Sequence, residues 1–569
     1  MSTPSSYTPS AYSAAPAPPA YSAATAVVAN PLYTPVTLTL RAENLPDMDL
    51  LSKSDPRCVV YSLAPKNPGY GFKPANGNFH AVETFSTERV MNDLNPHWRN
   101  VMTMNHQFES AQWLFFRVED VDRKHSADRR DQDFLGGVMA TLGDIVNGQK
   151  DDWCKLRLVK GDGTPVSDKK GNPSYLCIHV TIMPRVSYEF TGQCRFVLTK
   201  PRFFGSNAVF FTVKNQAGQQ FYESTKRDCD KKDGVRYADY PLFVIEGQHA
   251  KSTVWTFAHD HSDSDPIGTV ALSEEQLAAM RDGSTVNVRN RRDELTGQLV
   301  FTTLQKRATE EKIGDSIVQR IIDGHRFSVV VAVDYTGSNG DPRDSGSLHY
   351  ISERNQYLNS IEGILPIIGQ YDDDGKIPYY GFGMGYSNGV SHCQCLTEAA
   401  LGADGVIACY KNSIQDLKQG VFVLSGPTYF APVINETIAR VQASKAAFEA
   451  AAEAEVALNP SIPRKQHKEY TVLVLFTDGA ILDPTETISA IVAASYLPIS
   501  ILIVGVGDAN FATMNMLDND GKPPLKDSNQ RPARRDIVQF VPMRECLTAA
   551  ELQKQTLAEL PKQVLEYYR

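Results

Sequence analysis

Five aspartates at two loop positions are the side chains of this sequence best suited to bind a metal ion. They lie just beyond short apolar or alternating runs typical of β-strands, so we expect them in loops at strand ends. Carboxylate oxygens that converge from two loops are the ligands that Ca²⁺ takes, about six to eight oxygens in flexible geometry. A protein core does not collect this much negative charge without a cation. The five residues are Asp49, Asp55, Asp120, Asp122 and Asp133.

A second set of oxygen ligands follows the apolar run from 327 to 333. Asp334, Thr336 and Ser338 alternate, so their side chains can point the same way from a loop at the end of a strand. One carboxylate with two hydroxyls suits Mg²⁺, which keeps some of its waters and leaves room for an incoming ligand. This spacing is weak by itself, and two further segments strengthen it: Gly426-Pro427-Thr428 and Thr477-Asp478-Gly479.

The bulk composition is that of a globular protein with several domains. The chain has 569 residues, so we expect about three to four domains. Its net charge of -9 argues against general nucleic-acid binding. No apolar run is long enough for a transmembrane helix, and no secretory signal is expected. The nine cysteines have no regular spacing, and we expect reduced thiols, including Cys393 and Cys395, that bind no metal.

Residues 1–33 are rich in Pro, Ala, Ser and Tyr, and we expect a disordered tail because they cannot form a packed core. Within this tail, Pro18-Pro19-Ala20-Tyr21 matches the pattern that WW domains bind in polyproline conformation. Two interpretations stay open: a WW-domain ligand, or a tetrapeptide that arises from the composition of the tail.

The periodicity predicts two all-β sandwiches followed by an α/β doubly wound domain. Short runs with strand propensity, separated by turn residues, predict sandwiches at 34–183 and 184–305. In 306–569, nearly continuous apolar runs alternate with helical segments, which indicates a parallel sheet with right-handed crossovers. Ligands of such sheets bind beyond the carboxyl ends of the strands. The expected helices are 351–368, 432–457, 484–494 and 548–567.

The first β block resembles a C2 domain. The motifs that carry the resemblance are Ser54-Asp55-Pro56, Asn95-Pro96, Glu119-Asp120-Val121-Asp122 and Asp133-Phe134-Leu135-Gly136. The resemblance implies that the five aspartates named above are calcium ligands. Empty, they repel an anionic membrane; with calcium bound, the local charge reverses and lipid phosphate can complete the coordination.

Two details of these loops stay open. Arg129 and Arg130 either add affinity for an anionic leaflet, at roughly 1 kcal/mol for each basic residue, or pair with neighbouring acidic residues. Leu50 and Leu51 either insert at the membrane interface or pack inward.

The second β block also resembles a C2 domain but departs from the family at the ligand positions. Arg202 and Asn207 stand where the first loop would carry two aspartates. The acids between 260 and 265 are out of register with the strand. A cation at Arg202 opposes calcium, so we expect a weak or absent calcium site. The role of this block is then packing, a contact with another protein, or a calcium-independent contact with lipid through Arg289, Arg291 and Arg292.

The α/β block resembles a von Willebrand factor A domain, and more specifically the copine family, in which two C2 domains precede such a domain. The resemblance covers about residues 34–565 and rests on the segments 334–343, 347–350, 371–374, 381–383 and 426–432. It implies a metal-ion-dependent adhesion site for Mg²⁺ or Mn²⁺. The ligands that it implies are Asp334, Thr336, Ser338, Thr428 and Asp478.

These features together predict a non-catalytic adaptor. We expect it in the cytoplasm, docking with rising calcium on anionic phospholipid of the plasma membrane or other membranes through its first C2 domain. The A domain then recruits a protein partner. The alternative is an enzyme recruited to membranes, such as a ubiquitin-ligase-like or lipid-modifying protein. Against an enzyme stand the lack of a Walker-type phosphate loop, of a complete nucleophile elbow, and of Cys/His pairs for a zinc module.

Overall fold

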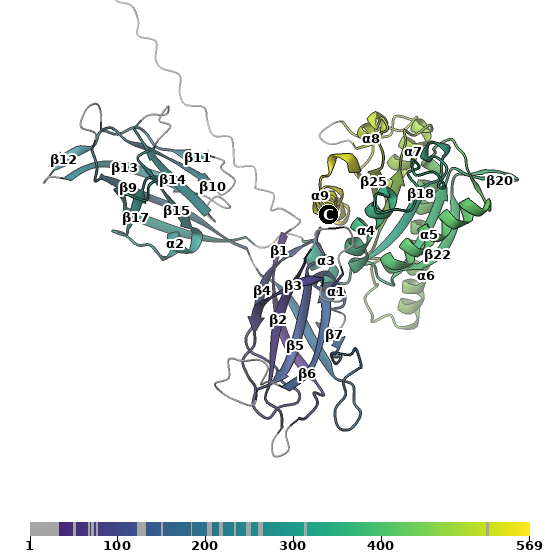
Figure 1. Ribbon diagram of the computed structural model, residues 1–569, viewed down its shortest axis with the longest axis horizontal. Helices are drawn as coiled ribbons and strands as arrows, with labels where there is room; N and C mark the ends of the chain where they lie inside the picture. Colours follow the sequence, from purple (N-terminus) through teal and green to yellow (C-terminus); the bar gives the residue numbers. More distant parts are fainter. Residues whose placement is uncertain are drawn as a thin grey trace, which may run out of the picture.

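The structure is a computed structural model that describes residues 33–48, 53–66, 69, 73–74, 78–121, 133–149, 152–183, 185–201, 207–215, 220–232, 235–245, 252–259, 266–311, 316–518 and 523–569. Figure 1 shows two β-sandwiches and an α/β domain. In the part of the chain so described, no helix combines the length and the apolar character needed to cross a membrane.

The first sandwich consists of two antiparallel sheets with the strand orders β4-β1-β8-β7 and β3-β2-β5-β6. Strand β1 alternates between core and surface, and its inward side chains Val36, Leu38 and Leu40 are fully buried. Helix α1 is fixed by a capping box between Thr141 and Asp144. The elements are β1 Tyr33–Glu43, β2 Pro56–Pro65, β3 Phe79–Ser86, β4 Met102–Gln107, β5 Trp113–Asp120, β6 Asp133–Thr141, α1 Leu142–Asn147, β7 Cys154–Arg157 and β8 Tyr175–Ile182.

The second sandwich is one continuous sheet, β11-β10-β14-β15-β16-β17-β9-β13-β12, that folds over on itself. Its two halves meet where Thr269 of β15 pairs with Arg289 of β16, and Phe196 stacks on Phe257 across the core at 4.3 Å. The elements are β9 Arg185–Leu198, β10 Phe210–Asn215, β11 Gln220–Glu223, β12 Asp230–Lys232, β13 Val235–Ile245, β14 Ser252–Ala258, β15 Gly268–Ser273, α2 Glu274–Ala279, β16 Thr285–Arg289 and β17 Leu295–Glu311.

Strand β17 extends past residue 305, where we expected the second sandwich to end. Its last residues continue the antiparallel ladder with the first residues of β9, from Gln305 opposite Thr191 to Glu311 opposite Arg185. Pairing with a strand far away in the sequence holds this segment extended, which the local pattern did not reveal.

The α/β domain is built on a sheet of order β22-β19-β18-β24-β25-β26. All of its neighbouring pairs are parallel except β19 with β22. Strand β18 sends Val329, Val331 and Val333 to one face and Val330 and Ala332 to the other, so both faces are buried. Helices α3, α4, α5, α9 and α10 pack on the first face, and α6, α7 and α8 on the second.

The strands of this domain are β18 Arg326–Asp334, β19 Lys376–Phe382, β20 Met384–Tyr386, β21 Gly389–Ser391, β22 Gln394–Leu401, β23 Val423–Leu424, β24 Glu469–Thr477, β25 Ile499–Gly505 and β26 Val538–Pro542. Its helices are α3 Ile317–Ile322, α4 Gln356–Ile368, α5 Gly402–Gln419, α6 Ala431–Leu458, α7 Pro484–Ala494, α8 Ala512–Leu517, α9 Ala549–Leu557 and α10 Leu560–Tyr568, with short 3₁₀ turns η4 Gly337–Asn339, η5 Gly369–Tyr371 and η6 Met543–Glu545.

Two expected helices differ in their limits. The helix expected from 351 begins at Gln356, because the side chain of Asn355 caps it by accepting a hydrogen bond from the Leu358 backbone N–H at 2.7 Å. The helix expected over 548–567 is divided into α9 and α10. Pro561 lies in the first turn of α10, where a missing N–H is tolerated, and it cannot continue a helix from before.

Candidate metal centres

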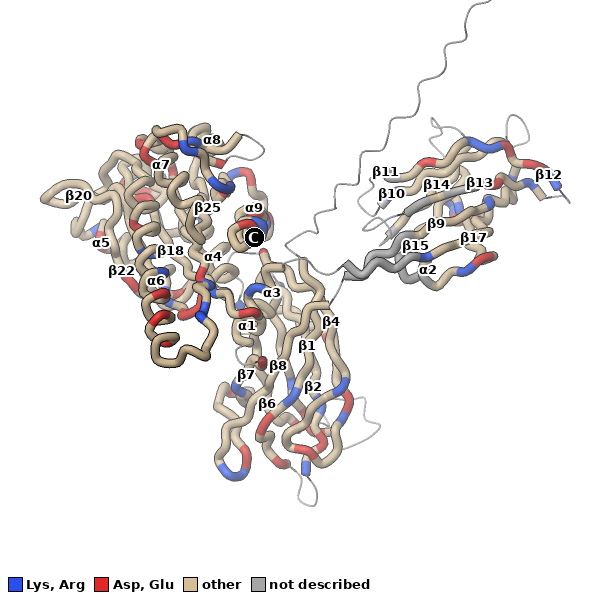
Figure 2. Tube along the Cα trace, turned by 180° about the vertical axis from the view of Figure 1, so that it is seen from behind, with Lys and Arg blue, Asp and Glu red and all other residues tan. Residues whose placement is uncertain are grey.

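Three of the predicted ligands lie at the end of the first sandwich where β5 stops and β6 starts. Asp120, the last residue of β5, is the ladder partner of Asp133 in β6 and of Pro56 in β2. Asp55 precedes Pro56, and its backbone N–H donates to Asp120 Oδ1 at 2.6 Å. These carboxylates therefore lie on adjoining strands at one end of the sandwich, where Figure 2 shows acidic segments.

Two of the five predicted calcium ligands, Asp49 and Asp122, lie outside the described residues, as do Leu50, Leu51, Arg129 and Arg130. Among the residues that are described, no group of three or more His, Cys, Asp or Glu side chains is close enough to hold a metal ion. The donors that are described are carboxylates, which fit Ca²⁺. The complete calcium site stays a prediction.

The structure adds Arg89 to this end of the sandwich, a residue that the sequence analysis missed. Its Nη1 lies 3.3 Å from Asp55 Oδ2 and donates to the Val121 carbonyl at 3.2 Å. The other carboxylate oxygen of Asp55 accepts a hydrogen bond from the Asn92 backbone N–H at 2.8 Å. Both oxygens of this predicted ligand thus have partners within the protein. No motif signals Arg89, because the β3–β4 connection reaches Asp55 only in the folded chain.

The α/β domain brings all five residues of the predicted magnesium-type site together. Thr336 Oγ1 donates to Asp334 Oδ1 at 2.6 Å and lies 3.0 Å from Ser338 Oγ. Ser338 Oγ donates to Asp478 Oδ1 at 3.0 Å, and Thr428 Oγ1 lies 3.5 Å from Thr336 Oγ1. The residues come from the ends of β18 and β24 and from the loop before α6. They form one continuous oxygen cluster at the carboxyl-terminal edge of the sheet.

The electrostatics of this cluster fit a divalent cation. Burial raises the pKa of Asp334. Burial and the nearby charge of Asp334 raise the pKa of Asp478 to about 7. Two buried carboxylates this close repel one another when both are ionised, and a cation between them removes the penalty. Carboxylate and hydroxyl oxygens are the donors that Mg²⁺ or Mn²⁺ takes, so the residues present fit the ion that the sequence predicted.

Neighbouring residues orient the cluster. Thr477 Oγ1 donates to the second oxygen of Asp334 at 2.6 Å. His349 is fully buried, with one ring nitrogen 3.0 Å from the Asp334 carbonyl and the other 3.0 Å from the Tyr410 hydroxyl. Burial lowers the pKa of His349 to about 3, so the ring is neutral. Its two ring nitrogens are engaged, which leaves it in a supporting role.

Asp483 holds the loop that carries Thr428. Its carboxylate accepts hydrogen bonds from the backbone N–H groups of Phe430 and Ala431 at 3.1 and 2.9 Å, and from Thr487 Oγ1 at 2.9 Å. This joins the start of α6 to the start of α7. No sequence motif marks Asp483, and its position five residues after Asp478 was the available signal.

In the second sandwich the positions that carried the prediction are mostly outside the described residues. Arg202 and the acids between 260 and 265 are among them, whereas Asn207 is described, before β10. Arg289 donates to the Asp293 carbonyl at 2.6 Å within the β16–β17 turn, next to the exposed Arg291 and Arg292. The weak calcium site of this sandwich stays a prediction.

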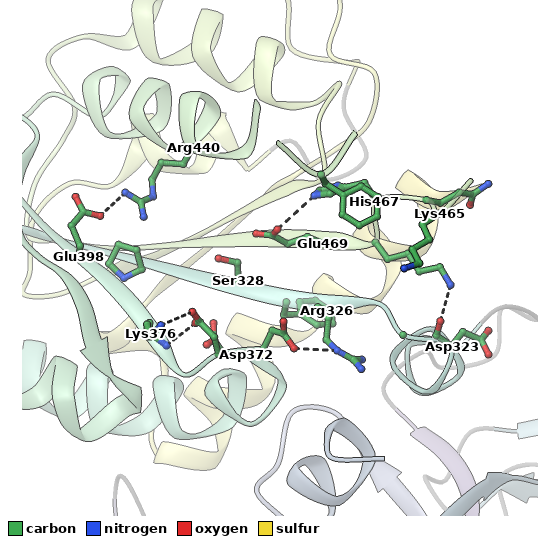
Figure 3. Close-up of a pocket in the computed structure, with 18 residues that line it drawn as sticks. Asp323, Arg326, Ser328, Asp372, Lys376, Glu398, Arg440, Lys465, His467 and Glu469 are labelled. Carbon is green, nitrogen blue, oxygen red and sulfur yellow. Dashed lines mark hydrogen bonds and ion pairs between the residues drawn. The ribbon is translucent and has the colours of Figure 1, made fainter. Parts of the chain in front are cut away.

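A cavity of about 680 Å³ opens at the opposite edge of the α/β sheet, where β18, β19 and β24 begin. Figure 3 shows its charged walls. Three lining cations pair with lining carboxylates: Arg326 with Asp373 at 3.1 Å, Lys376 with Asp374 at 3.6 Å and Arg440 with Glu398 at 2.7 Å. Because cations and carboxylates are mixed along the lining, the cavity favours neither an anionic nor a cationic ligand.

Comparison with known proteins identifies the two kinds of domain. Residues 347–569 match the family described as Copine, and residues 36–156 match the C2 domain. Copine-A of Dictyostelium discoideum is 30% identical over 573 residues, which covers 95% of this chain and 85% of that protein. Protein BONZAI 1 of Arabidopsis thaliana is 30% identical over 564 residues, with coverage of 95% and 91%. The solved structure of BON1-C2B matches with 20% identity and a TM-score of 0.21, over 28% of this chain and 99% of that one.

Proposed function

Because this chain belongs to the copine family, we propose that it is a calcium-dependent phospholipid-binding adaptor. The family matches confirm the predicted family and the predicted fold class, with a C2 domain at the amino terminus and a copine region of mixed α/β content. We therefore call the sandwiches the first and second C2 domains and the α/β domain the A domain.

The observation that carries the proposal is that Asp55, Asp120 and Asp133 lie at the same end of the first C2 domain, at the ends of adjoining strands. Together with Asp49 and Asp122 these carboxylates would hold Ca²⁺. Bound calcium reverses the charge of this end and lets lipid phosphate enter the coordination shell. The protein would then move from the cytoplasm to anionic membranes, the plasma membrane among them.

The oxygen cluster of the A domain would hold Mg²⁺ or Mn²⁺ and recruit a protein partner. An acidic side chain of the partner fits the position that the ion leaves open. We favour an adaptor over an enzyme because the cluster offers carboxylates and hydroxyls, and the buried His349 beside it has both ring nitrogens engaged and is neutral. A WW-domain protein at Pro18–Tyr21, which lies outside the described residues, stays a second proposed partner.

Sedimentation with phosphatidylserine vesicles tests the membrane half of the proposal. We expect pelleting in calcium and none in chelator at physiological salt. Asp120→Asn with Asp133→Asn should abolish the pelleting. Asp228→Asn with Asp293→Asn removes the same charge from exposed positions of the second C2 domain and should leave it unchanged. Pelleting of the wild type that persists in chelator would refute the calcium switch.

Titration with Mn²⁺, followed by the relaxation of bound water, tests the A-domain half. The titration is run in calcium that saturates the first C2 domain, because its carboxylates also suit Mn²⁺. We expect Mn²⁺ binding that Asp334→Asn removes while calcium-dependent pelleting continues. Mn²⁺ binding that survives Asp334→Asn under these conditions contradicts the assignment of this cluster as the metal site.

A further inference from the structure

The first C2 domain and the A domain share one buried aromatic cluster, although the second C2 domain lies between them in the sequence. Phe108, in the turn after β4, stacks on Tyr371 of η5 with ring centroids 4.7 Å apart and planes at 14°. Phe327, at the start of β18, lies 6.4 Å from the same Phe108 ring. All three side chains are at most 2% exposed, and they belong to one continuous core that includes residues of both domains.

Polar contacts surround this cluster. The Tyr371 hydroxyl lies 3.0 Å from His106 Nε2, and both residues are buried. Asn147, at the end of α1, donates through Nδ2 to the Asp372 carbonyl at 3.2 Å. These partners link α1 and the end of β4 with the amino-terminal edge of the A-domain sheet. Because the Tyr371 hydroxyl and the His106 ring are both buried, separating the two domains would break this hydrogen bond and expose both groups to water.

The second C2 domain is attached to this pair by a two-stranded stem. The chain leaves the first C2 domain after β8, enters β9 at Arg185, and returns through β17 to α3. The first residue of β9 pairs with the last residue of β17, Glu311. The described core of the second C2 domain is a separate cluster. In Figures 1 and 2 this domain stands apart from the other two.

The proposed metal centres lie at the ends that face away from the shared cluster. In the first C2 domain, β5 and β6 run between the end that holds α1 and the end that holds Asp120 and Asp133, a span of about 25 Å at roughly 3.3 Å per residue. In the A domain, β18 runs from Phe327 beside the cluster to Asp334 in the oxygen cluster. Each centre is thus separated from the contact by the length of a strand.

We propose that the first C2 domain and the A domain move as one body. In this body the end of the first C2 domain that carries Asp120 and Asp133 (the calcium end) keeps a fixed position relative to the sheet edge that carries Asp334 and Asp478. The second C2 domain is an arm inserted between the two domains in the sequence. Resting on the proposed function, this means that docking of the calcium end on a membrane also sets the direction in which the A domain offers its partner site. Calcium then controls both the location and the orientation of that site.

A disulfide across the contact tests this arrangement in the full chain. A Cβ placed on Gly143 of α1 would lie 3.1 Å from the Gln370 Cβ, a few tenths of an ångström below the short end of the range found in disulfides, about 3.5–4.5 Å. The two changes are made together, because the Gln370 side chain fills the space beside Gly143. We expect Gly143→Cys with Gln370→Cys to cross-link in nearly all molecules, in calcium and in chelator, as read by peptide mapping under non-reducing conditions.

The control pairs Gln370→Cys with Lys231→Cys, an exposed position on β12 of the second C2 domain, and should give no cross-link within the chain. If the first pair also fails to cross-link in protein whose circular dichroism is that of the wild type, the single body is refuted. If the first pair of substitutions prevents folding, the test uses Lys73→Cys with Asp404→Cys instead, cross-linked by a short bismaleimide. These two residues form a surface ion pair whose charged groups lie 2.6 Å apart.

Vesicle sedimentation of the cross-linked protein completes the test. We expect its calcium-dependent pelleting to equal that of the reduced protein within about twofold. A cross-link that abolishes the pelleting shown by the reduced form means that the domains must separate on docking, and it overturns the inference. Absence of pelleting in the wild type defeats the proposed function instead, and the cross-linking yield still decides whether the two domains form one body.

Discussion

Replacement of Asp478 by asparagine should stabilise the metal-free A domain and remove its response to magnesium. The carboxylate of Asp478 is 5% exposed and lies in a cluster with the buried Asp334. Its pKa is raised from an ordinary value of 3.8 to about 7. A rise of about three units corresponds to roughly 4 kcal/mol of unfavourable free energy when the group is ionised. The amide is still a buried polar group, so we expect about half of this, roughly 2 kcal/mol, to be recovered.

The sign of the pH dependence follows from the raised pKa. Between about pH 4 and pH 7 the folded protein binds a proton at Asp478 that the unfolded chain has released. The stability that this proton provides is fully present below about pH 4 and is lost as the pH rises through 7. In chelator the wild-type A domain should therefore melt at lower temperature at pH 8 than at pH 5.5. Saturating Mg²⁺ should reverse the difference, because it adds about 2.7 kcal/mol at a hundredfold excess over Kd.

Thermal melting at pH 8, in chelator and with Mg²⁺, is the assay. Because the A domain shares its core with the first C2 domain, the unit that melts has about 400 residues, and 2 kcal/mol corresponds to a rise in Tm of about 2–4 °C for Asp478→Asn in chelator. Asp508→Asn removes an exposed charge from the loop after β25 and serves as the matched control, with no rise expected. A lower Tm for Asp478→Asn in chelator, or an Mg²⁺ response equal to that of the wild type, would refute the reasoning.

Three further changes address other contacts. Arg89→Gln should raise the calcium affinity of the first C2 domain about 2- to 5-fold, as measured by calorimetry. Calcium must compete with the partly exposed ion pair between Arg89 and Asp55, which contributes about 0.4–1 kcal/mol. An unchanged affinity contradicts this. Asp483→Asn should weaken Mn²⁺ binding about 10-fold by loosening the loop before α6, and equal binding would show that the loop holds without it. Phe108→Ala should destabilise the shared core by about 3–5 kcal/mol in chemical unfolding and leave the transition of the second C2 domain in place.

Much of the fold could be read from the sequence because its signals are local. In β1 every second residue is apolar because one face of the strand is buried. In β18, β24 and β25 nearly every residue is apolar because both faces are buried. The same holds for the oxygen cluster. Asp334, Thr336 and Ser338 share one loop, and the ends of parallel strands must meet at one edge. The ends of the helices were not predicted correctly, because a capping side chain and a proline set them and the spacing of apolar residues does not reveal either.

What the sequence determined by itself is therefore the kind of each domain and the ligand types that each strand end carries. The tertiary structure alone decided which distant groups meet: Arg89 at Asp55, Asp483 at the start of α6, and Phe108 on Tyr371. The physical reason is that these contacts depend on the packing of elements separated by tens to hundreds of residues, and no local period records such packing. The join between the first C2 domain and the A domain, across an inserted domain, belongs to this second class.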